Sequence, residues 1–420
     1  MTTMPAPRQI RGRPGTSQPE PARRTAPAVP RRAAFWLLAL VLGVTMLGTT
    51  LPTPLYVIYQ GRWHLSAAMV TVTFAAYAAA VLATLLLAGR SSDEAGRRPV
   101  MAVALAASAV STVVFILAPD VGALIAGRIV SGLSAGLMTG TATAALTELI
   151  PASARRRASL VATAANMGGL GLGPLTAGLF AQYAPHPTTL VFEVYLGILA
   201  AAALILLLVP ETVRPRTRPG LRFAGLGIPA RGRGEFIAAA VAAFVAFALL
   251  GLFSSLVPGF IGGVLHYGSH AVQGAIVFLL LAVGTVTQVA LSRFGSRRVV
   301  LAGLGLFLTA LALIVAALAE AGMVLFLAGT VAGGAAVGAI FLGSLATASR
   351  LAPAGRRGQA ISAFFVACYA GLIIPVIGVG VLSELTGTFP AVLTFSVLLA
   401  VLCLFSITRI ARIASPGEPT

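Results

Sequence analysis

The chain has 420 residues, of which 58% are hydrophobic and 10% are charged, and its formal net charge is +18. So much apolar surface excludes an ordinary soluble domain. An excess of basic residues is typical of nucleic-acid binding, but here their distribution indicates another cause. All 29 basic residues are Arg, and 27 of them lie in the N-terminal tail and in alternate polar segments. This alternation follows the positive-inside rule. It predicts a multi-pass protein of the cell membrane, with both termini in the cytoplasm, the lipid bilayer as its surroundings and no nucleic-acid partner.

Twelve apolar runs are each long enough to cross a bilayer, which takes about 20 residues. They predict an all-α membrane protein with twelve transmembrane helices, because runs of this length cannot be barrel strands. The predicted spans are 33–58, 67–89, 100–118, 121–148, 157–181, 189–209, 235–261, 271–292, 299–318, 322–349, 358–384 and 389–410. The predicted organisation is a disordered cytoplasmic tail (1–32), a six-helix bundle (33–209), a cytoplasmic linker (210–234), a second bundle (235–410) and a short tail (411–420).

The first span contains Pro52 and Pro54 near its outer end. Proline cannot donate the helical hydrogen bond, so this pair is expected to open the helix. Carbonyl groups freed at membrane depth are tolerated where they face protein or a watery cavity. The alternative is that the helix simply ends at Pro52.

A short charged segment with the pattern G-x-x-x-D-x-x-G-R-R separates the second and third spans. Gly89 lets two helices approach closely, and Gly96 allows a backbone bend. Asp93 stands opposite the basic pair Arg97 and Arg98. We expect Asp93 to cap the positive N-terminal end of the eleventh helix when the protein is open to the outside. The alternative is a solvated loop that only obeys the charge bias.

The fourth span holds Arg128, about 9 Å from its middle at 1.5 Å per residue. An Arg at that depth is costly and is expected to face the bundle interior. The alternative is that it snorkels to the outer headgroups. The inner end of the span has the pattern E-x-x-P-x-x-x-R, from Glu148 to Arg155. Glu148 lies at the depth of Arg97 and is expected to pair with it, the alternative being a surface carboxylate.

The fifth span is rich in glycine and contains one proline. Gly169, Gly173 and Gly178 predict a grooved face on which another helix packs backbone to backbone. Pro174 breaks the hydrogen-bond ladder and predicts a kink. The alternative is ordinary glycine-rich membrane packing.

The second half of the chain repeats the first at an offset near 200 residues. Gly371 follows Gly169 by 202 residues, and Gly380 follows Gly178 by the same distance. Parallel halves of this kind predict two six-helix pseudo-repeats with a binding site near the bilayer midplane.

Length, repeat and motifs together resemble the major facilitator superfamily over residues 33–410. The charged segment is similar to the signature loop between helices 2 and 3 of that family, and R-x-x-x-G at Arg128 is similar to the helix-4 motif of its proton-coupled members. G-x-x-x-G-P-x-x-A-G resembles the helix-5 motif of its exporters. Two residues depart from the patterns: Glu94 stands where a basic residue is usual, and Ala177 where the motif has Gly. The resemblance implies the group of drug:proton antiporters responsible for multidrug efflux.

The resemblance implies a secondary transporter that exports drugs or other small amphipathic molecules by alternating access, coupled to protons. We expect a monomer with no cofactor, no metal and no catalytic residues. Arg128 is the one deep formal charge, so a neutral or anionic cargo is expected. No Asp or Glu falls in the middle third of a span, and Glu193 is the nearest candidate for the proton site. The other candidate cavity residues are Tyr56, Phe74, Tyr77, Asn166, Phe247, Gln288 and Tyr369.

Other functions stay open at this point. A facilitator-type uniporter, or an importer or exporter of a sugar or another metabolite, fits the same fold. A membrane-embedded enzyme requires clustered Asp, Glu or His near an interface, which the sequence does not offer. A non-transporting sensor would not need the gating motifs, so their presence in this chain counts against a sensor.

Overall fold

The computed structural model describes residues 29–88, 91–213, 225–230, 232–263, 265, 267–353 and 357–412. Outside them lie most of the predicted tails, much of the predicted linker and Gly89 of the charged segment. The helices are α1 (Arg31–Thr50), α2 (Pro52–Trp63), α3 (Ala67–Leu87), α4 (Ser91–Ala95), α5 (Arg97–Leu117), α6 (Val121–Leu149), α7 (Arg155–Tyr183), α8 (Pro187–Leu208), α9 (Arg233–Ser255), α10 (Val257–Gly263), α11 (His270–Leu291), α12 (Ser296–Ala319), α13 (Met323–Leu351), α14 (Arg357–Thr386) and α15 (Thr388–Ala411). A single 3₁₀ turn, Ala152–Ala154, precedes α7.

The predicted spans appear as long helices. Within the described residues, eleven helical spans are long and apolar enough to cross a membrane, α1 and α2 counting as one. The remaining long helix is α7, which has 29 residues but a more polar composition because it begins with three Arg and contains many Gly. It packs against α1 and α11 inside the bundle, so it is the twelfth crossing. The all-α fold with two six-helix pseudo-repeats is confirmed.

The first span continues beyond the end that the sequence predicts. Leu51 separates α1 from α2 but keeps helical backbone angles, φ −51° and ψ −42°. Pro52 then stands in the first turn of α2, where its missing N–H is not needed. The helix ends at Trp63 instead of residue 58, because His64 adopts a left-handed conformation with φ 51°. The simple helix end at Pro52 is therefore wrong.

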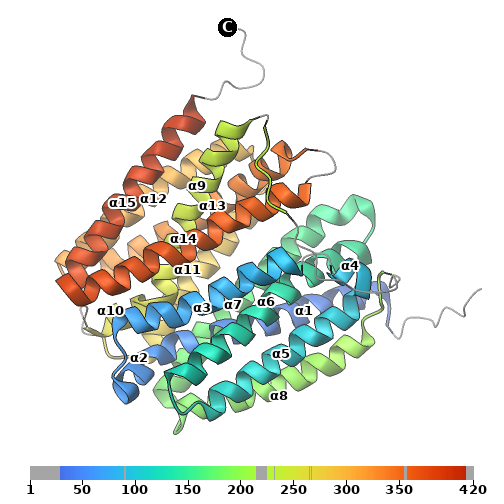
Figure 1. Cartoon of the computed structure of the whole chain (residues 1–420), viewed down its shortest axis with the longest axis horizontal. Coiled ribbons are helices and arrows are strands. Elements are labelled where there is room, and N and C mark those ends of the chain that lie inside the picture. The colour runs from blue at the N-terminus through green and yellow to red at the C-terminus, as the bar shows by residue number, and fades with distance from the viewer. Residues whose placement is uncertain are drawn as a thin grey trace, which may run out of the picture.

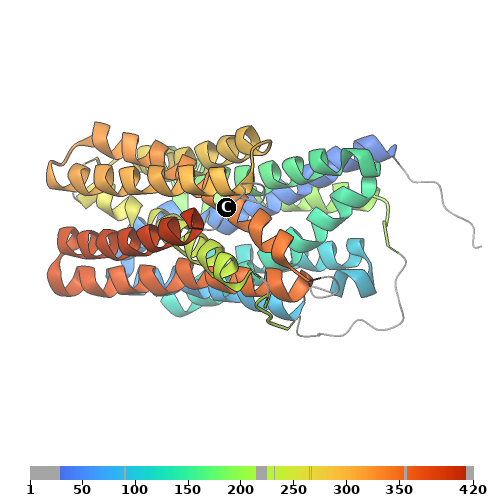
Figure 2. The same cartoon turned by 90° about the horizontal axis from the view of Figure 1, so that it is seen from above.

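The helices form two groups that meet along two seams (Figure 1). The first half, α1–α8, meets the second half, α9–α15, where α7 packs against α11 and where α3 packs against α14. Figure 2 shows the long helices running along the longest axis of the molecule. We call the end with α4 and the start of α5 the basic end, and the end with α2 and α10 the far end. The two cysteines, Cys368 and Cys403, are both buried and unbonded, as expected of small packing residues.

Candidate functional site

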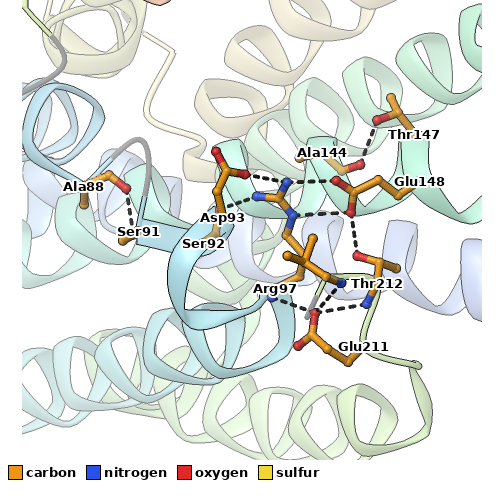
Figure 3. A network of polar contacts seen from close by, with 11 residues as sticks. Ala88, Ser91, Ser92, Asp93, Arg97, Ala144, Thr147, Glu148, Glu211 and Thr212 are labelled. Atoms are coloured by element: carbon orange, nitrogen blue, oxygen red, sulfur yellow. Dashed lines mark hydrogen bonds and ion pairs between the residues drawn. The ribbon is translucent and has the colours of Figure 1, made fainter. Parts of the chain in front are cut away.

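Arg97 is the centre of a polar cluster at the basic end (Figure 3). Its side chain is buried at the start of α5, and Nη2 lies 2.6 Å from Asp93 Oδ1 and 2.8 Å from Glu148 Oε1. Nε donates to Glu148 Oε2 at 3.3 Å, and Nη1 donates to Ser92 Oγ at 2.6 Å. The predicted ion pair between Arg97 and Glu148 is confirmed, and it ties α5 to α6. Each nitrogen of the guanidinium therefore has a partner, as a buried charge requires.

The segment after α8 completes this cluster with a residue that the sequence motifs did not reveal. The carboxylate of Glu211 accepts hydrogen bonds from the backbone N–H groups of Arg97 and Arg98, at 2.8 and 2.9 Å. It thus caps the positive N-terminal end of α5. Thr212 donates from Oγ1 to Glu148 Oε2 at 2.5 Å, so the same segment also holds the ion pair. The only sequence signal was an acidic residue directly after the sixth span.

Gly96 is required by this arrangement. Its φ of +97° is a conformation that residues with a side chain rarely adopt, and a Cβ at this position would lie 2.9 Å from Glu211 Oε2. Gly96 therefore has two roles: it allows the turn before α5, and it leaves room for the Glu211 carboxylate that caps α5. Of the other predicted gating residues, Arg98 donates from Nη2 to the Leu207 carbonyl at 3.1 Å, and Arg155 is exposed at the start of α7.

Asp93 pairs with Arg97 inside its own loop instead of reaching α14. Its side chain is 58% exposed, so this i,i+4 pair contributes about 0.5 kcal/mol or less to stability. We expect Asp93→Asn to leave insertion and folding unchanged but to reduce transport several-fold, because a gating loop would lose the charge that pairs with Arg97. Export by cells with equal amounts of protein is the measurement, with the far-end change Asp120→Asn as the matched control. Normal export by Asp93→Asn would contradict a gating role.

The second half holds a different ion pair at the same end. Arg350, at the end of α13, occupies the place that corresponds to Glu148, and it pairs with Glu235 of α9. Arg297, which corresponds to Arg97, donates from Nη2 to the Ala411 carbonyl of α15 at 2.8 Å. In the first half the ion pair joins α5 and α6, whose counterparts are α12 and α13. Because position 350 carries the opposite charge, the ion pair of the second half joins α9 and α13 instead. Both ion pairs join helices of the same half.

Among the described residues, side chains near the ends of α7 and α14 join the two halves at the far end through hydrogen bonds to backbone N–H groups. On one seam, the Gln182 side chain of α7 accepts from the His270 backbone N–H at the start of α11, at 3.0 Å. On the other seam, Glu384 of α14 accepts from the Ala68 backbone N–H at the start of α3, at 2.6 Å. Glu384 follows Gln182 by 202 residues, the same distance that separates Gly371 from Gly169. Each half therefore uses the same helix position to cap a helix of the other half, and we call these two contacts the outer caps.

The predicted glycines of α7 face two different neighbours. A Cβ on Gly173 would meet Thr50 and Leu51 in the first span, with Leu51 N at 3.2 Å. A Cβ on Gly178 would lie 2.6 Å from the His270 carbonyl oxygen and 3.1 Å from Gly274 Cα, across the seam. Gly169 touches the first span in the same way as Gly173, and Pro174 lies buried inside the helix. Close packing is confirmed, and only Gly178 of the three glycines lies on the seam.

We expect Gly178→Leu to force α7 and α11 apart and to make the protein leak protons, because no flexible side chain can yield beside it. Overpacking of this kind typically costs about 1–3 kcal/mol. Gly168→Leu is the control in the same helix, since a Cβ there meets nothing within 4 Å. Proton leak in proteoliposomes is the measurement. An equal leak in the two variants, or none in Gly178→Leu, would contradict the seam contact.

Arg128 is fully buried in α6 at 0% exposure, and it faces the bundle interior as predicted. Its Cζ lies 4.7 Å from the ring centre of Tyr77, 5.7 Å from Phe74 and 5.8 Å from Tyr56. Nη1 donates to the Thr49 carbonyl oxygen at 2.5 Å. Snorkelling to the headgroups is therefore wrong. Glu193, the predicted proton site, is exposed on α8 and makes no contact with Arg128 among those resolved for the described residues.

The other candidate cavity residues lie around the meeting of the two halves. Asn166 of α7 donates to Thr139 Oγ1 at 3.0 Å, and Tyr369 of α14 lies 6.0 Å from Phe247, centre to centre. Gln288 of α11 is buried and lines a cavity of about 20 Å³ together with Met167 of α7. That volume holds about one water molecule, so a cargo requires a wider conformation. Within the described residues, no group of three or more His, Cys, Asp or Glu is placed to hold a metal ion.

Comparison with known proteins places these features in one family. Residues 38–292 match the model of the Major Facilitator Superfamily. An uncharacterized MFS-type transporter, YceJ of Bacillus subtilis, is 30% identical over 185 residues, which is 44% of this chain and 46% of that protein. A triacylglyceride transporter of Mycolicibacterium hassiacum is 33% identical over 148 residues, 34% of this chain and 27% of that protein. The chain thus spans less than half the length of these curated relatives.

The fold is also that of solved transporters. A bacterial homologue of the human lysosomal transporter Spinster, in an inward-facing and unoccupied conformation, superposes with a TM-score of 0.71 at 17% identity. The match covers 92% of this chain and 99% of that one.

Proposed function

This chain belongs to the Major Facilitator Superfamily, and on that premise we propose that it exports small amphipathic molecules by alternating access, coupled to protons. It is a transporter in a membrane, and its fold provides two halves able to rock about a central site. In this proposal the basic end faces the cytoplasm, in accordance with the positive-inside rule.

The observation that carries the proposal is the unequal sealing of the two ends. At the far end the two outer caps join the halves through short hydrogen bonds to helix N-termini. Among the residues that the structure describes at the basic end, the ion pairs of Arg97 and Arg350 lie within a half. A side-chain hydrogen bond between described residues that crosses between the halves there is a long one, 3.4 Å from Arg156 Nη2 to Ser292 Oγ. This is the pattern expected of a gated transporter that is closed to the outside and can open to the inside.

The direction and the cargo class rest on two further features. The glycine and proline pattern of α7 resembles that of exporters, and Gly178 places it on the seam. The aromatic rings around Arg128 suit a cargo with an apolar body, and the triacylglyceride transporter among the relatives makes a lipid-like body one candidate. Since no acidic side chain in the described central region accompanies Arg128, a neutral or anionic cargo is favoured over a cation.

Overexpression in a bacterial host that lacks its own drug pumps tests export. The expected result is increased tolerance to amphipathic compounds, with phenicols and organic acids affected more than lipophilic dications such as ethidium. Increased sensitivity to the same compounds would instead indicate import. If ethidium-like cations are exported well, and phenicols and organic acids neither move nor compete, the charge argument is wrong. If neither tolerance nor sensitivity changes, an importer or uniporter of another metabolite is the alternative that remains.

A further inference from the structure

We propose that Arg128 is the anchor for a carboxylate group on the cargo, an inference that rests on the proposed transport function and narrows its substrate class. The guanidinium uses Nη1 for the Thr49 carbonyl oxygen. Nε and Nη2 are buried and have no hydrogen-bond partner. These two nitrogens form one edge of the planar group, and that edge matches the two oxygens of a carboxylate.

The surroundings of this free edge do not neutralise it. Within the described residues, the ion pairs of the chain involve Arg97 and Arg350, and none involves Arg128. Aromatic faces stabilise a cation, but they accept no full hydrogen bond from Nε or Nη2. A buried charge without a counter-ion is costly in a bilayer. The missing negative charge is therefore expected to come from outside the chain.

Two further donors lie on the neighbouring helix. Thr53 Oγ1 and the Tyr56 hydroxyl are buried in the first turns of α2, and neither has a hydrogen-bond partner. They are three residues apart, so they share one face of α2, and the Tyr56 ring is one of the three around Arg128. Arg128 and Tyr56 thus offer unpaired polar groups next to each other, and Thr53 adds a third one turn away on the same face of α2. A carboxylate is the small anion that suits this set, with the aromatic rings against the apolar part of the molecule.

The site is closed in this conformation, because Arg128 has no exposed surface. Tyr56 belongs to α2, the part of the first span beyond Leu51, and α2 packs against α10 and α11 of the other half. Separation of the two halves at the far end would therefore move the wall of the enclosure. We infer that the carboxylate enters or leaves the site as the halves change position.

Binding measurements on the full-length protein in nanodiscs of neutral lipid test this inference without requiring transport. The probes are 4-phenylbutyrate and octanoate, each compared with its neutral amide and with the amine of the same length, at pH 7.4. We expect each carboxylate to bind at least about tenfold more tightly than its amide, a difference of about 1.4 kcal/mol, and the amines to bind weakest. Equal binding of carboxylates and amides, or no binding of either carboxylate, overturns the proposal.

Conservative variants separate the anchor from a structural role. Arg128→Lys keeps the charge but loses the planar fork, so the carboxylate preference should largely disappear. Tyr56→Phe should reduce carboxylate binding several-fold while leaving the melting temperature equal or higher, since the buried hydroxyl has no partner to lose. Tyr59→Phe is the matched control, because its hydroxyl is also buried and unpaired but its ring stacks on Trp63.

A purely structural Arg128 predicts a different outcome, namely a lower melting temperature in Arg128→Lys with no change in carboxylate preference. The two proposals also fail separately. Selective carboxylate binding without transport refutes the exporter, whereas transport without any carboxylate preference refutes the anchor.

Discussion

Replacing Arg97 by methionine is expected to abolish transport and to destabilise the first half by about 2 kcal/mol. Removing one partner of a fully buried ion pair costs about 3–5 kcal/mol because the other charge is left unpaired. The cost is smaller here because the Glu148 side chain is 32% exposed and can take up water. The loss of transport should exceed what the destabilisation explains, since Arg97 also joins the α4 loop to α5 and α6.

The measurements are export at equal expression and the apparent melting temperature in detergent. Arg293→Met removes an exposed Arg at the same end of the second half and serves as the control, with no loss expected. Combining Arg97→Met with Glu148→Gln should cost less than the sum of the two single changes, because the second change removes the unpaired charge. Near-normal export by Arg97→Met, or strict additivity in the double variant, would contradict a functional ion pair at this gate.

Removing the outer caps is expected to open the far end. Glu384→Ala removes a charge-assisted hydrogen bond to the start of α3, so the population open at the far end should rise. Gln182→Ala removes a neutral hydrogen bond to the start of α11 and should have a smaller effect. The two caps lie on different seams, so their effects should add. Glu384→Gln should lie between wild type and Glu384→Ala, because the amide still accepts.

Spin labels at Arg62→Cys and Glu320→Cys report the separation of the two halves at the far end. Both positions are exposed, and they lie on opposite halves. The native cysteines are both buried, which limits labelling to the introduced sites. The expected result is a longer distance population in Glu384→Ala than in Gln182→Ala. An unchanged distance distribution in the double variant would show that the caps do not hold the far end closed.

Hydropathy and motif spacing predict the helices and one interaction of the candidate site. The Arg97–Glu148 pair follows from two motifs at the same depth, and α6 turns Arg128 inward because a charge is costly in lipid. Such signals depend on the properties of each residue and its near neighbours along the chain. They do not identify Glu211, which caps α5 from 114 residues away.

The contacts that sequence reasoning missed are long-range ones. Gln182 and Glu384 read as polar residues at helix ends, and only the packing of α7 on α11 and of α14 on α3 shows that they cap the opposite half. Arg350 pairs with Glu235, which lies on a different helix from the one that the repeat of the Arg97–Glu148 pair would indicate. The unpaired Nε and Nη2 of Arg128 likewise could not be predicted from the sequence. They depend on how α1, α2 and α3 pack around Arg128, and on whether these helices place a hydrogen-bond acceptor beside it.

Uptake into membrane vesicles of known orientation tests the central claim most directly. Inverted vesicles present the cytoplasmic face outward, and an acid interior supplies the proton gradient for an antiporter. The account predicts that labelled organic acids or phenicols accumulate in inverted vesicles, that right-side-out vesicles do not accumulate them, and that collapse of the gradient or Arg97→Met stops uptake. Accumulation in right-side-out vesicles, or uptake that is indifferent to the proton gradient and to Arg97, would contradict a proton-coupled exporter.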